Sequence, residues 1–167
     1  LKVVFKALFI LHSMMRSEST ISVFSYLAGD PSAILLRRVA TNGLSEYSYS
    51  KVLSRYAYYL DDRILSFREL GYDIVYAGKR DRFARLRKLS VSRGLFKEIS
   101  MIQRVMSSLL KCSFFSEDLR DEVSEAALQM TLKDLLAYYM AMNEGIINML
   151  EHYFEMSKAD AERSLEP

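Results

Sequence analysis

With 167 residues, the chain is long enough for one domain, which would bury about 70% of its extended-chain surface if complete. Half of the residues are hydrophobic and 26% are charged, which excludes an intrinsically disordered chain, and six Gly and two Pro leave room for long helices. The formal net charge of +2 is too small to indicate a particular kind of partner.

The single cysteine, Cys112, allows neither an intrachain disulfide nor a cysteine-rich metal site, which fits a reducing compartment. No apolar run approaches the roughly 18 residues that a bilayer-spanning helix needs, and the first residues lack the order of a signal peptide. We therefore expect a soluble cytosolic protein. Because Leu1 lies directly in an apolar helical pattern without a capping residue, we expect the chain to be the middle of a larger helical domain.

Hydrophobic periodicity predicts an all-α protein. Turn signals at residues 29–31 and 41–43 separate the early helices, and Ser116 is a suitable N-cap for the last long one, with acidic residues in its first turns. No period-2 strand pattern occurs, and the helices are too unequal for a regular repeat array. Stacked helical hairpins in a right-handed superhelical solenoid are the expected packing. The predicted helices cover residues 2–15, 20–27, 32–39, 48–75, 91–110, 116–156 and 159–165.

The segment from Leu132 to Met156 is the most apolar helical pattern in the chain. Side chains at spacings of three and four predict one buried face. Gly145 costs about 1 kcal/mol relative to alanine inside a helix, which indicates either a close helix contact or a break. Asn143 and Glu144 are expected to form hydrogen bonds beside it. The predicted core residues are Leu132, Leu135, Leu136, Tyr139, Ile146, Ile147, Leu150, Tyr153 and Phe154.

The motifs of common catalytic sites are missing. No P-loop, dinucleotide fingerprint or metal-binding His pair occurs, and His12 and His152 lie on different predicted helices, each most simply a structural residue. Asp61 and Asp62 point about 100° apart on a helix and, with Arg63, are predicted to form a solvated face. We expect no enzymatic activity, no metal and no cofactor.

One charged segment, residues 79–88, is a candidate site and is called the basic segment below. Such a cluster attracts anionic lipid headgroups by about 1 kcal/mol per residue, or nucleic-acid phosphates and other acidic partners. The simpler explanation is a solvated connector between two long helices, whose charges keep it soluble. Its basic residues are Lys79, Arg80, Arg82, Arg85, Arg87 and Lys88, and they form the predicted auxiliary lipid-binding patch.

Seven tyrosines between residues 47 and 76 invite comparison with a stacking platform for single-stranded nucleic acid. Tyr56, Tyr59 and Phe67 fall in register with the aliphatic residues, however, so most of this stripe is predicted core. Nucleic acid is not the favoured partner.

Several stretches resemble one known family. The sequence NEGIINMLEHYFEM, residues 143–156, resembles the signature of the ANTH domain in CALM-type clathrin assembly proteins, which are phosphatidylinositol-binding clathrin adaptors. The sequence VVFKALFILHSMM, residues 3–15, is similar to an early helix of that family. The pairs Arg55-Tyr56 and Tyr59-Leu60, the triplet 66–68 and the pair Lys133-Asp134 also agree in order, so the resemblance covers nearly the whole chain.

This resemblance implies a superhelical adaptor domain that binds phosphatidylinositol 4,5-bisphosphate on the inner plasma membrane and is linked to clathrin by a flexible tail. Some members also bind vesicle SNAREs. The family's lipid site, lysines and a histidine, precedes the segment matching residues 3–15, so no lipid ligand is carried over. We expect residues 1–167 to be the central part of one ANTH domain, with the lipid-binding helices, the C-terminal helices and the tail outside it. The expected protein is a non-catalytic endocytic adaptor, cytoplasmic and peripheral at coated pits; a helical scaffold for SNARE or other partner helices is the alternative.

Overall fold

The computed structural model describes residues 2–29, 48–78, 84–112 and 122–164, and these residues contain helices and no strand. The all-α prediction is therefore confirmed for the described residues, while the predicted helix 32–39 and the Ser116 cap lie outside them. The α-helices are α1 (Lys2–Met14), α2 (Thr20–Gly29), α4 (Ser48–Leu70), α5 (Ile74–Gly78), α6 (Ala84–Lys88), α7 (Leu95–Leu110), α8 (Glu122–Glu151) and α9 (Lys158–Ser164). Two 3₁₀ turns, η2 (Val91–Arg93) and η4 (Tyr153–Glu155), complete the order.

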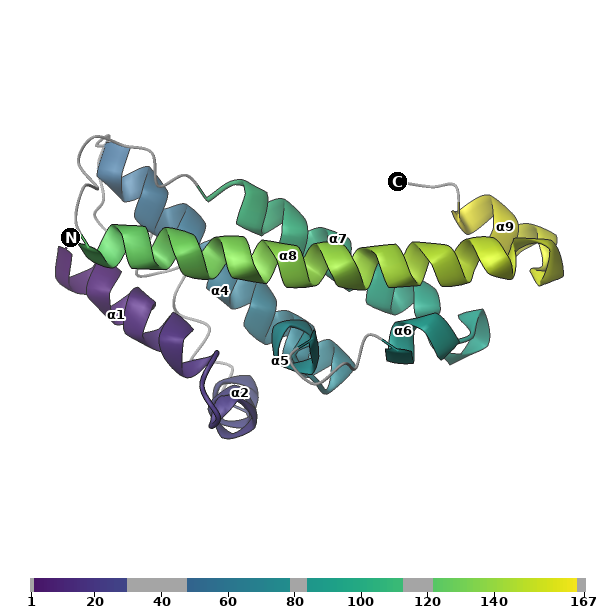
Figure 1. The fold of residues 1–167 in the computed structure, drawn as a ribbon, viewed down its shortest axis with the longest axis horizontal. Helices are drawn as coiled ribbons and strands as arrows, with labels where there is room; N and C mark the ends of the chain where they lie inside the picture. The colour runs from purple at the N-terminus through teal and green to yellow at the C-terminus, as the bar shows by residue number, and fades with distance from the viewer. Residues whose placement is uncertain (1, 30–47, 79–83, 113–121, 165–167) are drawn as a thin grey trace.

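Helix α8 runs the length of the molecule, and α1, α5, α6 and α7 pack against it (Figure 1). Helix α4 packs along α7, α7 along α8, and α1 and α2 cover α4. The short helices α5 and α6 also lie on α8. Residues such as Leu60, Ile64, Ile102 and Val105 fill the space between the long helices and are completely buried.

Glycines set two helix boundaries that periodicity placed wrongly. Gly71 has a φ of 76°, and its N–H donates to the carbonyl of Phe67 at 2.8 Å, so α4 ends at Leu70 and the predicted continuous helix 48–75 is divided. Gly94, with a φ of 104°, separates η2 from α7, so the long helix begins at Leu95 instead of residue 91. The end of the basic segment, predicted as a connector, is helical as α6.

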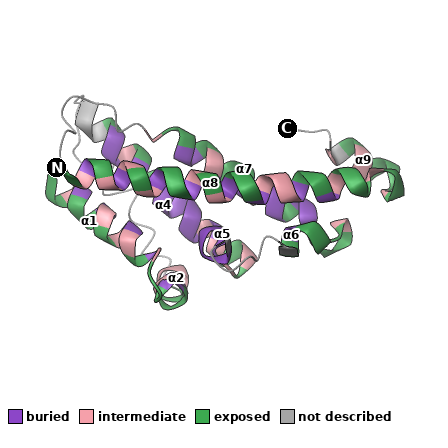
Figure 2. Cartoon of the chain, in the orientation of Figure 1, coloured by how far each residue is buried: buried purple, intermediate pink, exposed green. Residues whose placement is uncertain are grey.

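The predicted core face of α8 is wrong. Most of the large apolar side chains on that face are exposed, and the buried face is the opposite one, lined by small and polar residues at alternating spacings of three and four (Figure 2). Close helix packing favours small side chains, which is why the bulky ones lie outside. The buried residues are Ala127, Thr131, Asp134, Tyr138, Ala141, Gly145 and Asn148. The exposed residues, called the apolar stripe below, are Leu132, Leu136, Tyr139, Met140, Ile146, Ile147 and Leu150.

Gly145 marks a close contact between α8 and α7. A Cβ atom added there would lie 3.0 Å from Cγ1 of Ile99, closer than ordinary van der Waals contact. Helix α8 continues through this residue without interruption. Of the two explanations that the sequence left open for this glycine, the close helix contact is therefore correct.

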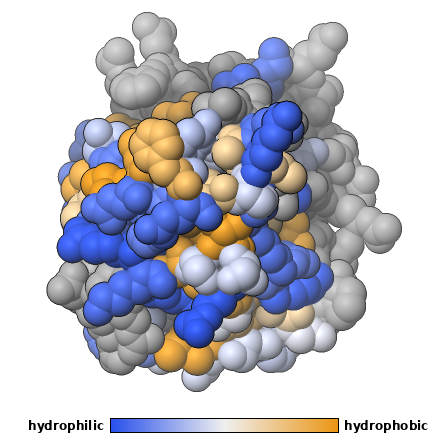
Figure 3. All heavy atoms as spheres, turned by 90° about the vertical axis from the view of Figure 1, so that its right-hand side faces the viewer, coloured by the Kyte–Doolittle hydropathy of each residue, from blue (hydrophilic) through white to orange (hydrophobic). Residues whose placement is uncertain are grey.

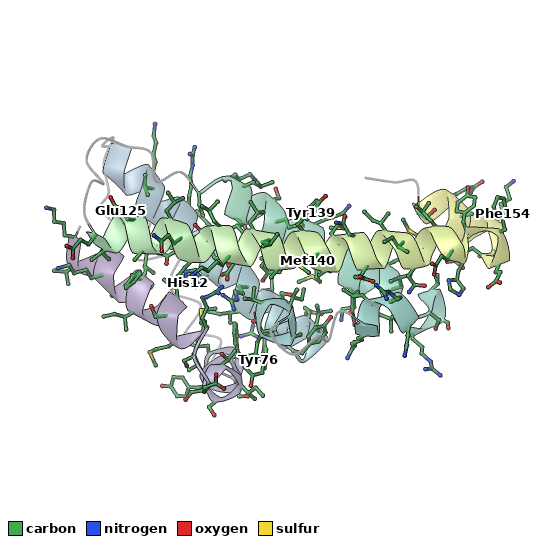
Figure 4. All side chains as sticks on the ribbon, viewed as in Figure 1. His12, Tyr76, Glu125, Tyr139, Met140 and Phe154 are labelled. Carbon is green, nitrogen blue, oxygen red and sulfur yellow. The ribbon has the colours of Figure 1, made fainter. Side chains whose placement is uncertain are left out.

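A buried polar network joins α1, α4 and α8 around Asp134. Its carboxylate accepts hydrogen bonds from Nε2 of His12 at 2.7 Å, from Nη1 of Arg63 at 2.9 Å and from the Tyr59 hydroxyl, and it pairs with Arg16. His12 lies where α1 meets α4 and α8 (Figure 4). These contacts tie helices that are up to 122 residues apart in sequence.

The predicted solvated face at residues 61–63 is also wrong, because Asp61, Asp62 and Arg63 are buried. The guanidinium of Arg63 donates from Nε and Nη2 to the two oxygens of Asp73, both at 2.8 Å, and from Nη2 to the carbonyl of Met15. A buried arginine held by two carboxylates satisfies its charge inside the protein, which hydropathy alone cannot reveal.

Candidate functional site

The basic segment enters the described structure as α6, which lies on α8. Leu86 is buried against the core, and Arg85, Arg87 and Lys88 are exposed around it. Lys79, Arg80 and Arg82, the other members of the predicted patch, lie outside the described residues.

Arg85 is engaged with α7. Its Nη2 donates to Oε1 of Glu98 at 2.6 Å, and its guanidinium lies 4.7 Å from the centre of the Tyr72 ring. The Tyr72 hydroxyl donates to the other oxygen of Glu98 at 2.6 Å, and burial together with this carboxylate raises the pKa of Tyr72. Arg85 therefore has its charge balanced inside the protein.

Arg87 forms an ion pair with a residue of α8. Its Nε and Nη2 each donate to one oxygen of Glu144 at 2.6 Å, a bidentate pair, although the arginine side chain is more than half exposed. The predicted hydrogen-bonding role of Glu144 is confirmed. Among the described residues, Lys88 has no ion-pair partner, so it is the patch member on α6 whose charge faces solvent unbalanced.

Asn148 on α8 binds the end of the basic segment, a role that the sequence did not lead us to predict. Its amide Nδ2 donates to the carbonyls of Leu86 and Leu89 at 2.6 and 2.7 Å, which satisfies backbone groups at the end of α6. The available signal was a polar amide inside an apolar run, three residues after Gly145. Glu144, Gly145 and Asn148 therefore position α6 and α7 on α8.

A groove of about 790 Å³ lies where α6, η2 and the start of α7 meet the end of α8. Lys88, Lys97 and His152 line it together with Glu155 and Asp160, and apolar side chains contribute to its wall. Figure 3 views this end of the molecule and shows hydrophilic side chains around a small apolar area. Lys97 pairs with Glu69 at 2.9 Å. The groove thus presents both positive and negative side chains. This mixture suits a ligand held by hydrogen bonds better than it suits the attraction of anions by charge alone.

The described residues also bear on a metal site, a reactive thiol and a membrane-spanning helix. No group of three His, Cys, Asp or Glu residues there could hold a metal ion. Burial raises the pKa of Cys112 to about 12, so its thiol stays protonated at neutral pH and is a poor nucleophile. Among the described helices, none is long and apolar enough to cross a bilayer.

Comparison with known proteins places this geometry in a family. The sequence model of the ANTH domain matches residues 2–166. An ENTH domain-containing protein of Schizosaccharomyces pombe is 30% identical over 166 residues, and the human phosphatidylinositol-binding clathrin assembly protein is 32% identical over 165; each match covers 98% of this chain. The mouse clathrin coat assembly protein AP180 is 30% identical over 172 residues, also covering 98%. The chain spans 24%, 25% and 18% of the lengths of these three relatives, respectively. The match across almost every residue shows that the chain belongs to the ANTH domain family.

Proposed function

We propose that this domain is a non-catalytic endocytic adaptor module that binds phosphoinositides at the plasma membrane and supports clathrin coat assembly. The observation that carries the proposal is the family match over residues 2–166, with relatives named as phosphatidylinositol-binding and clathrin assembly proteins. The module acts as a peripheral membrane protein at coated pits, and clathrin is bound through a tail outside residues 1–167.

The proposed mechanism is electrostatic recruitment. In this proposal, residues 1–167 are the central part of the domain, and other parts of the domain supply the primary ligands of phosphatidylinositol 4,5-bisphosphate. The basic segment adds an auxiliary contact with the anionic leaflet. Because Arg85 and Arg87 already pair with Glu98 and Glu144, the attraction comes mainly from the other patch residues. These are Lys79, Arg80, Arg82 and Lys88.

Liposome co-sedimentation at low salt tests this mechanism. Replacing Lys79, Arg80, Arg82 and Lys88 with Gln removes four charges that each contribute about 1 kcal/mol near an anionic surface, or about fivefold in affinity per residue. Lys133→Gln, at an exposed residue of α8, measures the effect of one charge elsewhere. Binding by the fourfold variant that equals wild-type binding would show that the basic segment is no membrane contact.

A second candidate function is a protein-binding helical scaffold that holds SNARE or other partner helices without direct lipid binding. The apolar stripe of α8 is the observation that favours it, since amphipathic helices bind through such faces. A protein that does not bind anionic liposomes but binds a SNARE helix would support the scaffold function. Lipid binding without binding of a helix would exclude it.

A further inference from the structure

A second basic site lies between α4 and α7, away from the basic segment. Among the described residues, side chains of α4 and α7 and the C-cap residue of α7, Lys111, line a cleft of about 390 Å³. Lys111, the C-cap residue of α7, lies 14 residues after Lys97, or about 21 Å along a helix, so the cleft is separate from the groove beside α6. The lining residues that the structure describes are Arg55, Tyr58, Asp62, Arg104, Ser108 and Lys111.

The two helices present these side chains on facing surfaces. Residues 55, 58 and 62 follow spacings of three and four on α4. Residues 104 and 108 of α7 and its C-cap residue 111 follow the same spacings, so each set shares one helix face. Cys112 joins the helices at one end of the cleft through a contact of 3.5 Å between its Sγ and the carbonyl oxygen of Arg55. The spacing of the charged groups is thus set by packed helices.

The charges in this cleft do not cancel. Asp62 is the single acid among the lining residues that the structure describes. Its Oδ1 accepts from Nε of Arg104 at 3.2 Å and lies 3.1 Å from Nη2, which leaves other guanidinium donors available. Neither Arg55 nor Lys111 has an ion-pair partner among the described residues. Counted over the described lining residues alone, three cations and one carboxylate leave an excess of two positive charges.

We propose that this cleft binds a phosphate-bearing ligand through Arg55, Arg104 and Lys111. Like charges gathered in one cleft repel one another, and a bound anion reverses that cost. Guanidinium groups bind phosphate oxygens in a bidentate manner and an ammonium adds a point charge, while the described part of the lining offers no aliphatic side chain for an apolar ligand. The source of the phosphate is either a lipid headgroup or a soluble phosphate compound. This site goes beyond the proposed function, because it does not use the basic segment.

The test titrates the chain with inositol 1,4,5-trisphosphate while NMR follows the backbone amides of residues 55–62 and 104–112. We expect saturable shifts there in the wild type and at least a tenfold loss of affinity in Arg55→Gln/Lys111→Gln. The control Lys6→Gln/Lys133→Gln removes the same charge from exposed residues elsewhere and should bind like the wild type. Unchanged thermal unfolding midpoints would confirm that both double variants fold.

Vesicles distinguish the two sources of phosphate. Loss of binding by the cleft variant to phosphatidylcholine vesicles containing phosphatidylinositol 4,5-bisphosphate would identify a lipid headgroup, and a loss confined to the trisphosphate would identify a soluble ligand. Equal trisphosphate affinity in the cleft variant and its control, or shifts absent from both segments, would overturn the proposal. The basic-segment variant tests the proposed function separately, so either idea can fail alone.

Discussion

The buried carboxylate of Asp134 links α8 to two other helices, which no single apolar side chain of α8 does through polar contacts. It is completely buried and receives donors from α1 and α4, while Arg63 passes the network on to Asp73 before α5. The groups compensate one another: two arginines meet two carboxylates, and neutral His12 donates to Asp134 while it accepts from the Tyr56 hydroxyl at 2.8 Å. Removing one member leaves buried charge uncompensated.

Asp134→Ala should therefore reduce the free energy of unfolding by about 3–5 kcal/mol, the usual consequence of breaking a buried ion pair. Urea unfolding followed by circular dichroism measures the loss. Glu125→Ala provides the control, because Glu125 is exposed on the same helix (Figure 4) and a surface change should stay within about 0.5 kcal/mol. A loss below about 1 kcal/mol for Asp134→Ala would contradict the compensating role.

His12 makes the same network sensitive to pH. Burial lowers its pKa well below the usual value, and the nearby Arg63 and Arg16 lower it further. The charge of Asp134 acts in the opposite direction, but both arginines already share it. The folded state thus keeps His12 neutral, whereas the unfolded chain gains a proton below pH of about 6.5.

This difference in proton binding makes the protein less stable as pH falls, because the contribution of neutral His12 is complete above about pH 6.5 and is lost below it. Between pH 7.5 and 5.5 the free energy of unfolding should decrease by about 1 kcal/mol from this residue. His12→Gln should remove that part of the slope, and His152→Gln, at an exposed residue, should retain it. Identical slopes in wild type and His12→Gln would contradict the assignment.

At the scale of elements, the sequence predicted most helices but chose the wrong face of α8. Both faces repeat at spacings of three and four, and hydropathy favoured the face with Leu136 and Leu150. The face that packs against the other helices carries Asp134, Tyr138 and Gly145. What such residues contribute to stability depends on partners up to 122 residues away in the sequence. Gly71 and Gly94 ended helices through positive φ angles, which periodicity does not report.

The candidate sites were predictable to different degrees. Clustering in sequence identified the basic segment, but the partners of Arg85 and Arg87 come from α7 and α8 and could not be read from their neighbours. The cleft between α4 and α7 was missed because its cations are spread over residues 55–111 and meet only after the helices pack. The segments that resemble the family do meet in the folded structure, because His12, Tyr56, Tyr59 and Asp134 belong to one hydrogen-bond network.

The contact between α7 and α8 gives a prediction for Gly145. Alanine there gains up to about 1 kcal/mol of helix propensity, but its methyl group must displace the Ile99 side chain. We expect Gly145→Ala to be less favourable by about 1 kcal/mol in the presence of Ile99 than in the Ile99→Ala background, where the space is open. A double-mutant cycle in urea measures this coupling, and equal effects in both backgrounds would refute the contact.

At the scale of the whole molecule, α8 packs against other helices with one face and exposes the opposite face. Helices α1, α5, α6 and α7 lie on its packed side, and the apolar stripe lies opposite, with Tyr139 and Met140 labelled on the helix in Figure 4. The exposed fractions in the stripe range from 37% for Ile146 to 62% for Leu150. A row of this kind is more extensive than the scattered apolar residues of an ordinary surface.

The open face should make residues 1–167 bind a hydrophobic dye and associate at high concentration, because contiguous apolar surface favours both. Leu136→Gln/Leu150→Gln should lower dye fluorescence and the weight-average mass in sedimentation, with little change in the unfolding midpoint, since both side chains are more than half exposed. The matched control is Ile21→Gln/Tyr26→Gln on α2, which removes two exposed apolar groups away from α8. Equal dye binding in the two double variants would mean that the stripe of α8 is not the surface responsible.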